Sequence, residues 1–458
     1  MKFILSALAL SLLTVSCTST DLTDNQSVAP KNIIMVIGDG MGPAYTTAYR
    51  YFRDNPNTQV LEETVFDRHL KGMSSTYPAP VSGVVTDSAA SATALATGVK
   101  SYNNAIGVDV NKQPVETVLE WAKLQGKKTG VVVTSQINHA TPASYLTHNE
   151  SRKNYNAIAD SYLDNGIKAD LYLGGGWKYF IREDRNLVEE FKFAGFHYID
   201  TYQGLANLPK DKPVLGLFAQ VGLPWALDDT NQYRLSTMTK AAAHHLIDLQ
   251  RNDKSEDKGF FMLIEASQID WAGHGNSVSD AMAEMDDLAK TLEYLEHFVQ
   301  HNPDTLVIVT ADHSTGGFTV AANGKYEWNA KYLRTMKHSA NYIAAMLTNN
   351  EINNQTANTL FNFELTPQEL ALLILTKQTP VVSQSSNIYQ DKSASAVKKA
   401  LLKAVKSIMD KRSNSGWTSG GHTAIDVPVF AFGKQSEQFK GLQDNTDIAD
   451  KIFTLLGK

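Results

Sequence analysis

Acidic and imidazole side chains stand at four places where apolar runs of this sequence give way to small or polar residues. An aspartate in a glycine-rich turn is by itself more often a turn former than a ligand, and a lone histidine is usually structural. Three aspartates, three histidines and a glutamate at such places are hard to explain as turns. These residues are Asp39, Glu265, Asp270, His274, Asp312, His313 and His422.

The mixture of carboxylates and imidazoles predicts metal binding. Asp270 and His274 are four residues apart, so one face of a helix could present both side chains to a single ion. Mixed Asp and His ligation suits Zn²⁺, whereas a neighbouring set of oxygen ligands suits Mg²⁺. Because fully buried acids are costly without a compensating cation, the spacing favours a metal site over a group of unrelated turns.

A second chemical feature is the run VTDSAASATALATG at residues 85–98, which is rich in hydroxyls and almost free of large side chains. We expect a strand over 82–86 and an alanine-rich helix that begins at Ser88. The Ser88 oxygen would then lie near free backbone N–H groups and the positive end of the helix dipole, which lowers the cost of an alkoxide. A packing helix of small residues accounts for the alanines, but it does not account for the Asp87-Ser88 pair.

The elements that must position these side chains are apolar, β-branched runs separated by helical patterns. Near-continuous hydrophobicity predicts strands that are buried on both faces, and alternation with helices predicts a mainly parallel sheet with helices on both sides. The fold class is therefore α/β, a three-layer αβα sandwich whose ligands bind where strands end. The strands are predicted at 32–37, 129–134, 259–264, 306–309 and 427–432, and helices at 114–124, 238–250 and 281–298.

The alternation stops between about residues 323 and 415, where strand signals are few and helical patterns dominate. Thr366-Pro367-Gln368-Glu369 has the spacing of a capping box with proline in the first turn, and 394–409 predicts another helix. We interpret this region as a helical insertion in a single catalytic domain that spans 32–458.

The amino terminus has the layout of a secretory signal. Lys2 precedes a short apolar run. The predicted signal, residues 1–16, ends directly before Cys17, and the residues around this point are similar to a bacterial lipoprotein box. We expect export across the inner membrane, a lipidated Cys17, a tether over 17–31, and a periplasmic or outer-membrane location. Cys17 is the only cysteine, so the mature chain has no intrachain disulfide. The net charge of -6, without a basic stripe, argues against a nucleic-acid partner.

Three motifs resemble those of bacterial alkaline phosphatases, and the similarity runs from about residue 32 to 432 outside the insertion. The motifs are the segment from Thr86 to Lys100, the block His139-Ala140-Thr141-Pro142-Ala143-Ser144, and Ser151-Arg152-Lys153. The resemblance implies an alkaline phosphatase that hydrolyses small phosphate monoesters through a phosphoserine, with two zinc ions and one magnesium ion as cofactors.

The resemblance also implies a role for individual residues. Ser88 would be the nucleophile, Arg152 would bind phosphate, and Asp87 would orient Arg152. One zinc ion would be held by Asp270, His274 and His422, and the second by Asp39, Asp312 and His313. The magnesium site would be formed by Asp39, His139, Thr141 and Glu265.

Two positions depart from the well-studied enteric enzyme, which has Asp in place of His139 and Lys in place of Trp271. Other members of the family carry His and Trp there. A histidine near the third ion allows zinc to compete with magnesium. The insertion has no close counterpart in the enteric enzyme, and by analogy with the family we expect it to form a crown over the site and a homodimer contact.

Two alternative functions are weighed against this one. A phosphodiesterase of the same superfamily would usually have a threonine nucleophile and no arginine clamp, whereas Ser88 and Arg152 favour monoesters. An inactive phosphate- or metal-binding lipoprotein would not need the complete set of expected ligands. Turnover of a monoester against its diester distinguishes the first alternative, and Ser88→Ala distinguishes the second.

Overall fold

The structure is a computed structural model that describes residues 29–253, 257–379, 381–382, 390–391 and 394–458. The predicted signal segment 1–16, Cys17 and most of the 17–31 tether lie outside the described residues. Within the described ranges, we find no helix with the length and apolar character needed to span a bilayer.

A ten-stranded sheet forms the centre of the molecule, in the order β16-β2-β15-β8-β1-β7-β3-β4-β6-β5. Neighbouring strands are parallel except that β15 runs antiparallel to both β2 and β8. The predicted mainly parallel sheet is therefore confirmed. The strands are β1 (Asn32–Gly38), β2 (Leu70–Ser75), β3 (Lys128–Gln136), β4 (Leu171–Gly175), β5 (His197–Ile199), β6 (Val214–Leu217), β7 (Phe260–Ala266), β8 (Thr305–Thr310), β15 (Val427–Gly433) and β16 (Gly441–Asp444).

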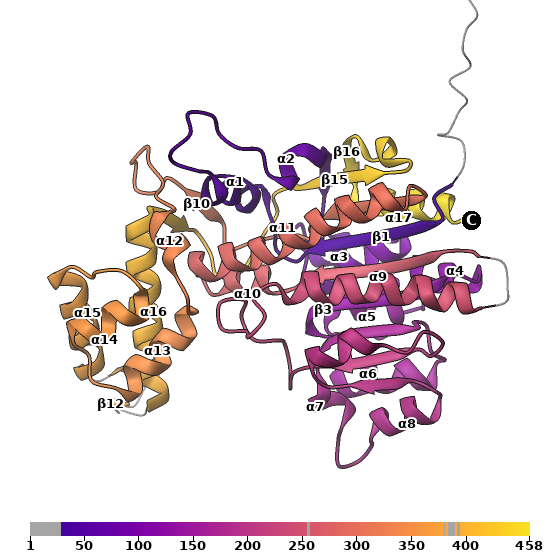
Figure 1. The fold of residues 1–458 in the computed structure, drawn as a ribbon, viewed down its shortest axis with the longest axis horizontal. Helices are drawn as coiled ribbons and strands as arrows, with labels where there is room; N and C mark the ends of the chain where they lie inside the picture. The colour runs from indigo at the N-terminus through magenta and orange to yellow at the C-terminus, as the bar shows by residue number, and fades with distance from the viewer. Residues whose placement is uncertain (1–28, 254–256, 380, 383–389, 392–393) are drawn as a thin grey trace, which may run out of the picture.

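Helices cover both faces of the sheet, because the central strands are apolar on both sides. In β1, Ile33, Met35 and Ile37 belong to one core, whereas Ile34 and Val36 belong to the other. Figure 1 shows α9 and α11 in front of the sheet and α3 and α5 behind it. One face is covered by α1 (Pro43–Arg53), α9 (Arg234–Asn252) and α11 (Val278–His301), and the other by α3 (Ser88–Thr97), α4 (Val118–Leu124), α5 (Ala140–Leu146) and α17 (Asn445–Leu455).

Two predictions near the amino-terminal motifs need correction. The strand expected over 82–86 is wrong: a 3₁₀ turn covers Pro80–Ser82, and an irregular stretch leads to Asp87. Gly83 has a φ of 80°, and Val84 is exposed, so these apolar residues do not belong to a buried strand. The helix expected from residue 114 begins only at Val118, because Thr117 forms a capping box with Glu120.

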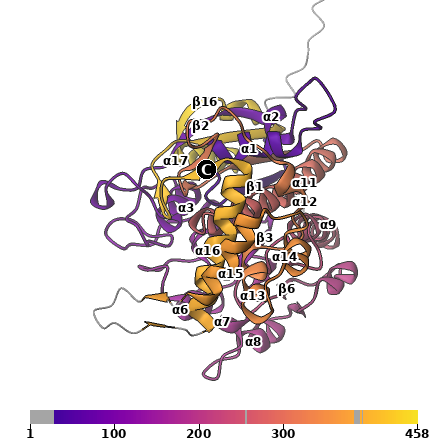
Figure 2. The ribbon, with the colours of Figure 1, turned by 90° about the vertical axis from the view of Figure 1, so that its left-hand side faces the viewer.

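The region between residues 323 and 415 folds as a group of helices beside the sheet. Figures 1 and 2 show these helices together at one end of the molecule, with α16 the longest of them. The predicted capping box of Thr366 and Glu369 opens α15, as expected. The helices are α12 (Lys331–Thr335), α13 (Ala340–Asn349), α14 (Asn354–Phe361), α15 (Pro367–Gln378) and α16 (Ala394–Ser413), with a short ribbon of β11 (Val381–Val382) and β12 (Gln390–Asp391).

This group of helices is tied to the rest of the molecule at its base and through its core. Strands β10 (Phe318–Val320) and β13 (Ser415–Trp417) pair antiparallel where the chain leaves the α/β core and returns to it. Ile343 of α13 and Val405 of α16 belong to the same apolar core as Met285 of α11. The remaining described α-helices and strands are α2 (Val65–His69), α6 (Tyr155–Asp164), α7 (Trp177–Phe180), α8 (Leu187–Phe193), α10 (Gln268–His274), β9 (Ser314–Thr315) and β14 (His422–Thr423).

Candidate active site

The first site residue follows β1 directly. Asp39 is fully buried in the turn Gly38-Asp39-Gly40, and Gly40 has a φ of 75°. A Cβ on Gly40 would lie 2.7 Å from the Asp270 Cα and 2.8 Å from the Thr315 Oγ1. Only glycine lets this turn approach both neighbours so closely. The Gly40 N–H also donates to the Asp312 Oδ1 at 3.0 Å, which fixes that carboxylate beside Asp39.

Ser88 is the first residue of α3, whose small side chains are all buried. Asp87 is the N-cap, and its Oδ1 accepts a 3.0 Å hydrogen bond from the Ala90 N–H. The Ser88 Oγ lies 3.1 Å from the His313 Nε2. One turn further on, the Ser91 hydroxyl donates to the Asp312 backbone oxygen at 2.6 Å. The alanine-rich surface of α3 therefore lets the helix start lie against the loop that follows β8.

The first candidate metal-binding cluster joins α10 to β14, the short strand before β15. The Nε2 atoms of His274 and His422 are 3.0 Å apart, and they lie 3.5 Å and 3.6 Å from the oxygens of Asp270. The His274 Nδ1 is 2.7 Å from the Gly420 oxygen, and the His422 Nδ1 is 2.9 Å from the Thr86 oxygen. Because a carbonyl can only accept, each Nδ1 carries the proton and each Nε2 lone pair points into the cluster.

The second cluster consists of Asp39, Asp312 and His313, all fully buried. The His313 Nε2 lies 3.2 Å from the Asp312 Oδ2 and 3.5 Å from the Asp39 Oδ1. The third cluster consists of Asp39, His139 and Glu265, also buried. Asp39 is common to both, so the second and third clusters are neighbours that share one carboxylate.

Within the described part of the chain, six buried polar atoms at these clusters have no hydrogen-bond partner. They are both carboxylate oxygens of Asp39, the Glu265 Oε1, the Asp312 Oδ2, the His139 Nδ1 and the Thr141 Oγ1. Buried polar groups are normally satisfied, and buried carboxylates are costly without a cation. The donor set of oxygens and imidazole nitrogens therefore fits bound metal ions, with Thr141 at the third cluster.

The electrostatics of the protein alone point the same way. Burial, with the charges of Asp312 and Asp270, raises the pKa of Asp39 well above its ordinary value. Burial also raises the pKa of Glu265 to about 7. Burial and the charge of Arg152 lower the pKa of His139 to about 3. The carboxylates repel one another and the imidazole is neutral, which is the state in which it can bind a metal.

Arg152 reaches the site from the loop between α5 and α6. Its Nη1 donates to the Asp87 Oδ2 at 3.1 Å, and its Nη2 lies 3.4 Å from the His139 Nε2. The same Asp87 Oδ2 accepts from the Asn104 N–H at 3.0 Å. Asp87 therefore holds the guanidinium next to the start of α3, where a planar donor fork suits phosphate.

Two further residues belong to the site. Trp271, which follows Asp270, packs edge-to-face against His139 with ring centroids 6.1 Å apart. Thr315 was not among the predicted site residues, yet its hydroxyl donates to the Asp270 Oδ1 at 2.5 Å. Its place two residues after His313 is the only signal in the sequence, and a threonine in a loop has many ordinary explanations.

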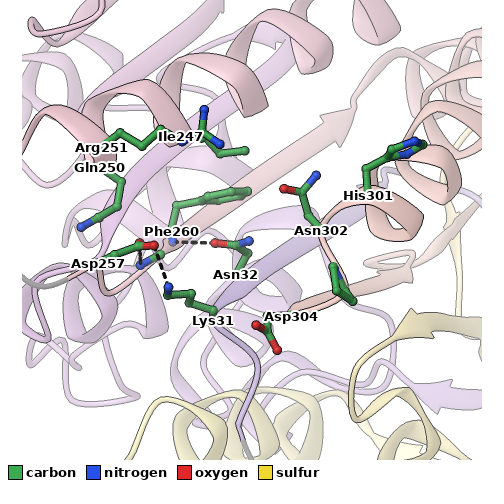
Figure 3. Close-up of a pocket in the computed structure, with 12 residues that line it drawn as sticks. Lys31, Asn32, Ile247, Gln250, Arg251, Asp257, Phe260, His301, Asn302 and Asp304 are labelled. Carbon is green, nitrogen blue, oxygen red and sulfur yellow. Dashed lines mark hydrogen bonds and ion pairs between the residues drawn. The ribbon is translucent and has the colours of Figure 1, made fainter.

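A separate cavity lies at the opposite ends of the central strands. It has a volume of about 240 Å³ and is formed around the starts of β1, β7 and β8. Figure 3 shows Lys31, Asn32, Asp257 and Asp304 around it, with Lys31 paired to Asp257 at 2.6 Å. The metal-binding clusters lie at the other ends of these strands, so this cavity is not part of the candidate active site.

The fold and the clusters define a metal-binding α/β protein whose polar centre lies where the parallel strands end. The alkaline phosphatase family model matches residues 30–457, and the chain belongs to this family.

Individual relatives match over nearly the whole chain. Alkaline phosphatase 4 of Bacillus subtilis is 46% identical over 434 residues, which cover 93% of this chain and 88% of that protein. The crystal structure of a cold-active alkaline phosphatase from Shewanella sp. matches with a TM-score of 0.84 and 48% identity, over 93% of this chain and 100% of that chain. The TAB5 alkaline phosphatase, 28% identical with a TM-score of 0.66 over 94% and 98% of the chains, is represented by a His-to-Glu mutant with Mg bound in its M3 site.

Proposed function

We propose that this chain hydrolyses phosphate monoesters to an alcohol and inorganic phosphate, and that Ser88 becomes phosphorylated during turnover. The observation that carries the proposal is the position of the Ser88 Oγ, 3.1 Å from the His313 Nε2 and at the start of α3. The free N–H groups of the first helical turn lower the cost of negative charge on the serine oxygen and on a bound phosphoryl group.

Arg152 and Asp87 supply phosphate binding in this proposal. The guanidinium offers a planar pair of donors to two phosphoryl oxygens, and the ion pair with Asp87 holds it in place. A monoester has one more ionisable oxygen than a diester, so this cation favours the monoester. The diesterase alternative is disfavoured for this reason.

The proposed cofactors are two zinc ions and one magnesium ion. Asp270, His274 and His422 would hold one zinc, and Asp39, Asp312 and His313 the other. Zinc pairs of this kind supply Lewis acidity to the attacking and leaving oxygens and lower the pKa of a bound water. Asp39, His139, Thr141 and Glu265 would hold the magnesium. Mg in the M3 site of the TAB5 His-to-Glu mutant supports a third site, and His139 in this chain admits competition by zinc.

The positions of the first two clusters support a direction for the proposed reaction. The second cluster lies beside Ser88, and the first lies around His274 and His422, so the leaving alcohol would depart next to those two histidines. Ser88 attacks phosphorus and the alcohol leaves; water then attacks the phosphoserine and releases phosphate. Two successive displacements give net retention of configuration at phosphorus.

A direct test uses Ser88→Ala with a phosphate monoester and the matching diester. We expect steady hydrolysis of the monoester to disappear, while the variant keeps its metal content and its unfolding temperature. Acid quenching of the unaltered protein with labelled substrate should leave label on the chain, and Ser88→Ala should leave none. Unchanged turnover by Ser88→Ala would contradict the covalent route, and faster turnover of the diester would favour the alternative.

The metal proposal has its own measurement. Elemental analysis should find about two zinc ions and one magnesium ion per chain, and chelation should abolish activity until metal is restored. An intact protein without bound metal that still hydrolyses the monoester would overturn the assignment of all three clusters.

We also infer that the chain is exported and anchored by lipid at Cys17, in the periplasm or at the outer membrane. Support comes from the apolar run after Lys2 and from the lipoprotein-like residues before Cys17. Residues 32–458 would act as one catalytic domain, with the insertion as a crown and a homodimer contact. Metabolic labelling with a fatty acid, lost in Cys17→Ser, tests the anchor.

A further inference from the structure

A cavity of about 610 Å³ lies between the insertion and the metal-binding helix α10. One wall is the turn Gly275-Asn276, which directly follows His274. The opposite wall is a face of α16, and Gly416 and Trp417 of β13 close one end. In Figure 2, α16 runs along the side of the molecule that faces the viewer.

Contacts across the cavity hold its walls in place. The Lys406 Nζ donates to the Gly275 backbone oxygen at 2.6 Å, which ties α16 to the turn after His274. The Asn276 side chain donates to the Ser419 oxygen at 2.8 Å, in the loop that leads to His422. The Trp417 Nε1 donates to the Asp410 Oδ1 at 3.0 Å. The cavity is therefore formed by the same segments that position His274 and His422.

The charge around the cavity is positive. Lys399, Lys403 and Lys406 line it, and Asp410 is the acid among its lining residues. Lys399 and Lys403 are exposed and have no ion pair with any acid in the described part of the chain. Asp410 is already occupied by Trp417, and burial raises its pKa to about 6. Two lysines one helical turn apart thus present charge to the cavity that the turn after His274 borders.

The cavity borders the turn that directly follows His274. In the proposed reaction the oxygen of the leaving alcohol lies beside His274 and His422, and the His274 side chain is 42% exposed. Consecutive Cα atoms are about 3.8 Å apart, so Gly275 places the cavity wall next to this ligand. A second group on the leaving alcohol that reached past this turn would meet Lys399 and Lys403.

We propose that this cavity is a subsite for a second phosphoryl group carried by the leaving alcohol, held by Lys399 and Lys403. The inference rests on the proposed function and defines a substrate class for it: short bisphosphorylated alcohols. Lysine ammonium groups bind phosphate as point charges without fixed geometry, so the subsite accepts alcohols of different shape provided the second phosphate can reach it.

The experiment compares kcat/KM for propanediol and hexanediol bisphosphates with kcat/KM for the corresponding monophosphates. Two equivalent phosphates alone give a ratio of about two by statistics. We expect at least one spacer to exceed this in the unaltered protein, by roughly three- to tenfold, the range that exposed ion pairs allow. The ratio should fall toward two in the double variant Lys399→Met, Lys403→Met. It should also fall as salt is raised, because the charges are screened.

Lys398→Met is the matched control, because Lys398 is an exposed neighbour on α16 that does not line the cavity. It should keep the ratio of the unaltered protein. A ratio of about two for both spacers, a ratio unaffected by the double variant, or an equal fall in Lys398→Met would overturn the subsite. Failure of the monophosphates to react at all would instead contradict the proposed function.

Discussion

The Thr315 hydroxyl donates a 2.5 Å hydrogen bond to the Asp270 Oδ1 and lies 3.2 Å from the His313 Nδ1. One side chain therefore contacts a residue of each of the first two clusters. Because the Thr315 hydroxyl directs its proton toward Asp270, its oxygen accepts from the His313 Nδ1. The lone pair of the His313 Nε2 then faces Ser88 and Asp39. The Tyr45 hydroxyl, which donates to the Thr315 backbone oxygen at 2.7 Å, fixes this geometry.

Thr315→Val should weaken metal binding, because it removes the hydroxyl and keeps the side-chain shape. Hydrogen bonds to metal ligands are worth roughly 10- to 100-fold in metal affinity. Competition with a chromophoric zinc chelator measures the change directly, without an activity assay. Thr315→Ser should restore most of the affinity; equal affinity in the valine variant would show that the hydrogen bond does not support the clusters.

Asp87→Asn should raise KM for a monoester by roughly three- to tenfold and lower stability by about 1 kcal/mol, because the amide nitrogen cannot accept from the Asn104 N–H. The amide oxygen can still cap α3 through the Ala90 N–H, but the charge that orients Arg152 is lost. Asp87→Ala should in addition lose the cap, at a cost of about 1 kcal/mol. Steady-state kinetics and thermal unfolding separate the two effects. An unchanged KM in the asparagine variant would remove Asp87 from phosphate binding.

His139→Asp should make activity more dependent on added magnesium. The change replaces a buried neutral imidazole beside Asp39 and Glu265 with a carboxylate. Mg²⁺ prefers oxygen ligands of this kind. A magnesium titration of the metal-stripped variant, followed by elemental analysis, measures the effect. Activity that stays the same across the titration would count against magnesium at the third cluster.

The stability of the fold should fall as the pH rises through the range in which Asp280 loses its proton. Burial, with the charge of Asp228, raises its pKa to about 7, although its carboxylate accepts from the Ser277 hydroxyl and the Ala340 N–H. The folded state then holds the proton more tightly than the unfolded chain, so stability is lost between the ordinary pKa of 3.8 and about 7. Asp280→Asn carries no charge in this range.

The difference in unfolding temperature between Asp280→Asn and the unaltered protein reports this linkage. It should shift in favour of the asparagine variant between about pH 5 and about pH 7 and stay level above that. Because Ala340 begins α13, the titration acts where the insertion contacts α11. A difference that is the same at every pH would contradict a raised pKa.

The sequence was most informative where apolar runs are long and buried on both faces. All five predicted core strands are present, and the spacing of Asp270 and His274 does place them together on α10. The polar residues that follow these strands meet because parallel strands end at the same edge of a sheet. Val84 and Val85 were misleading, because β-branched residues favour strands only when neighbours cover them.

Other features depend on contacts that no local pattern records. The short strands β5 and β6 lie toward one edge of the sheet, where a few apolar residues suffice. Thr315 gains its role only because the turn at Gly40 brings Asp270 within reach. Lys399 and Lys403 resemble any solvated face of an amphipathic helix until α16 is placed against the turn after His274.

The pairing of β10 with β13 makes the whole segment from residue 321 to 414 equivalent to the loop of a β-hairpin. The two strands fix the positions at which the chain departs and returns, whatever lies between them. His313 precedes this ribbon and His422 follows it, and β9 pairs with β14 directly beside it. All residues of the three candidate metal clusters therefore lie outside the segment that β10 and β13 enclose, so a change in the length of this segment alters the helices beside the site and leaves the sequence of the clusters unchanged.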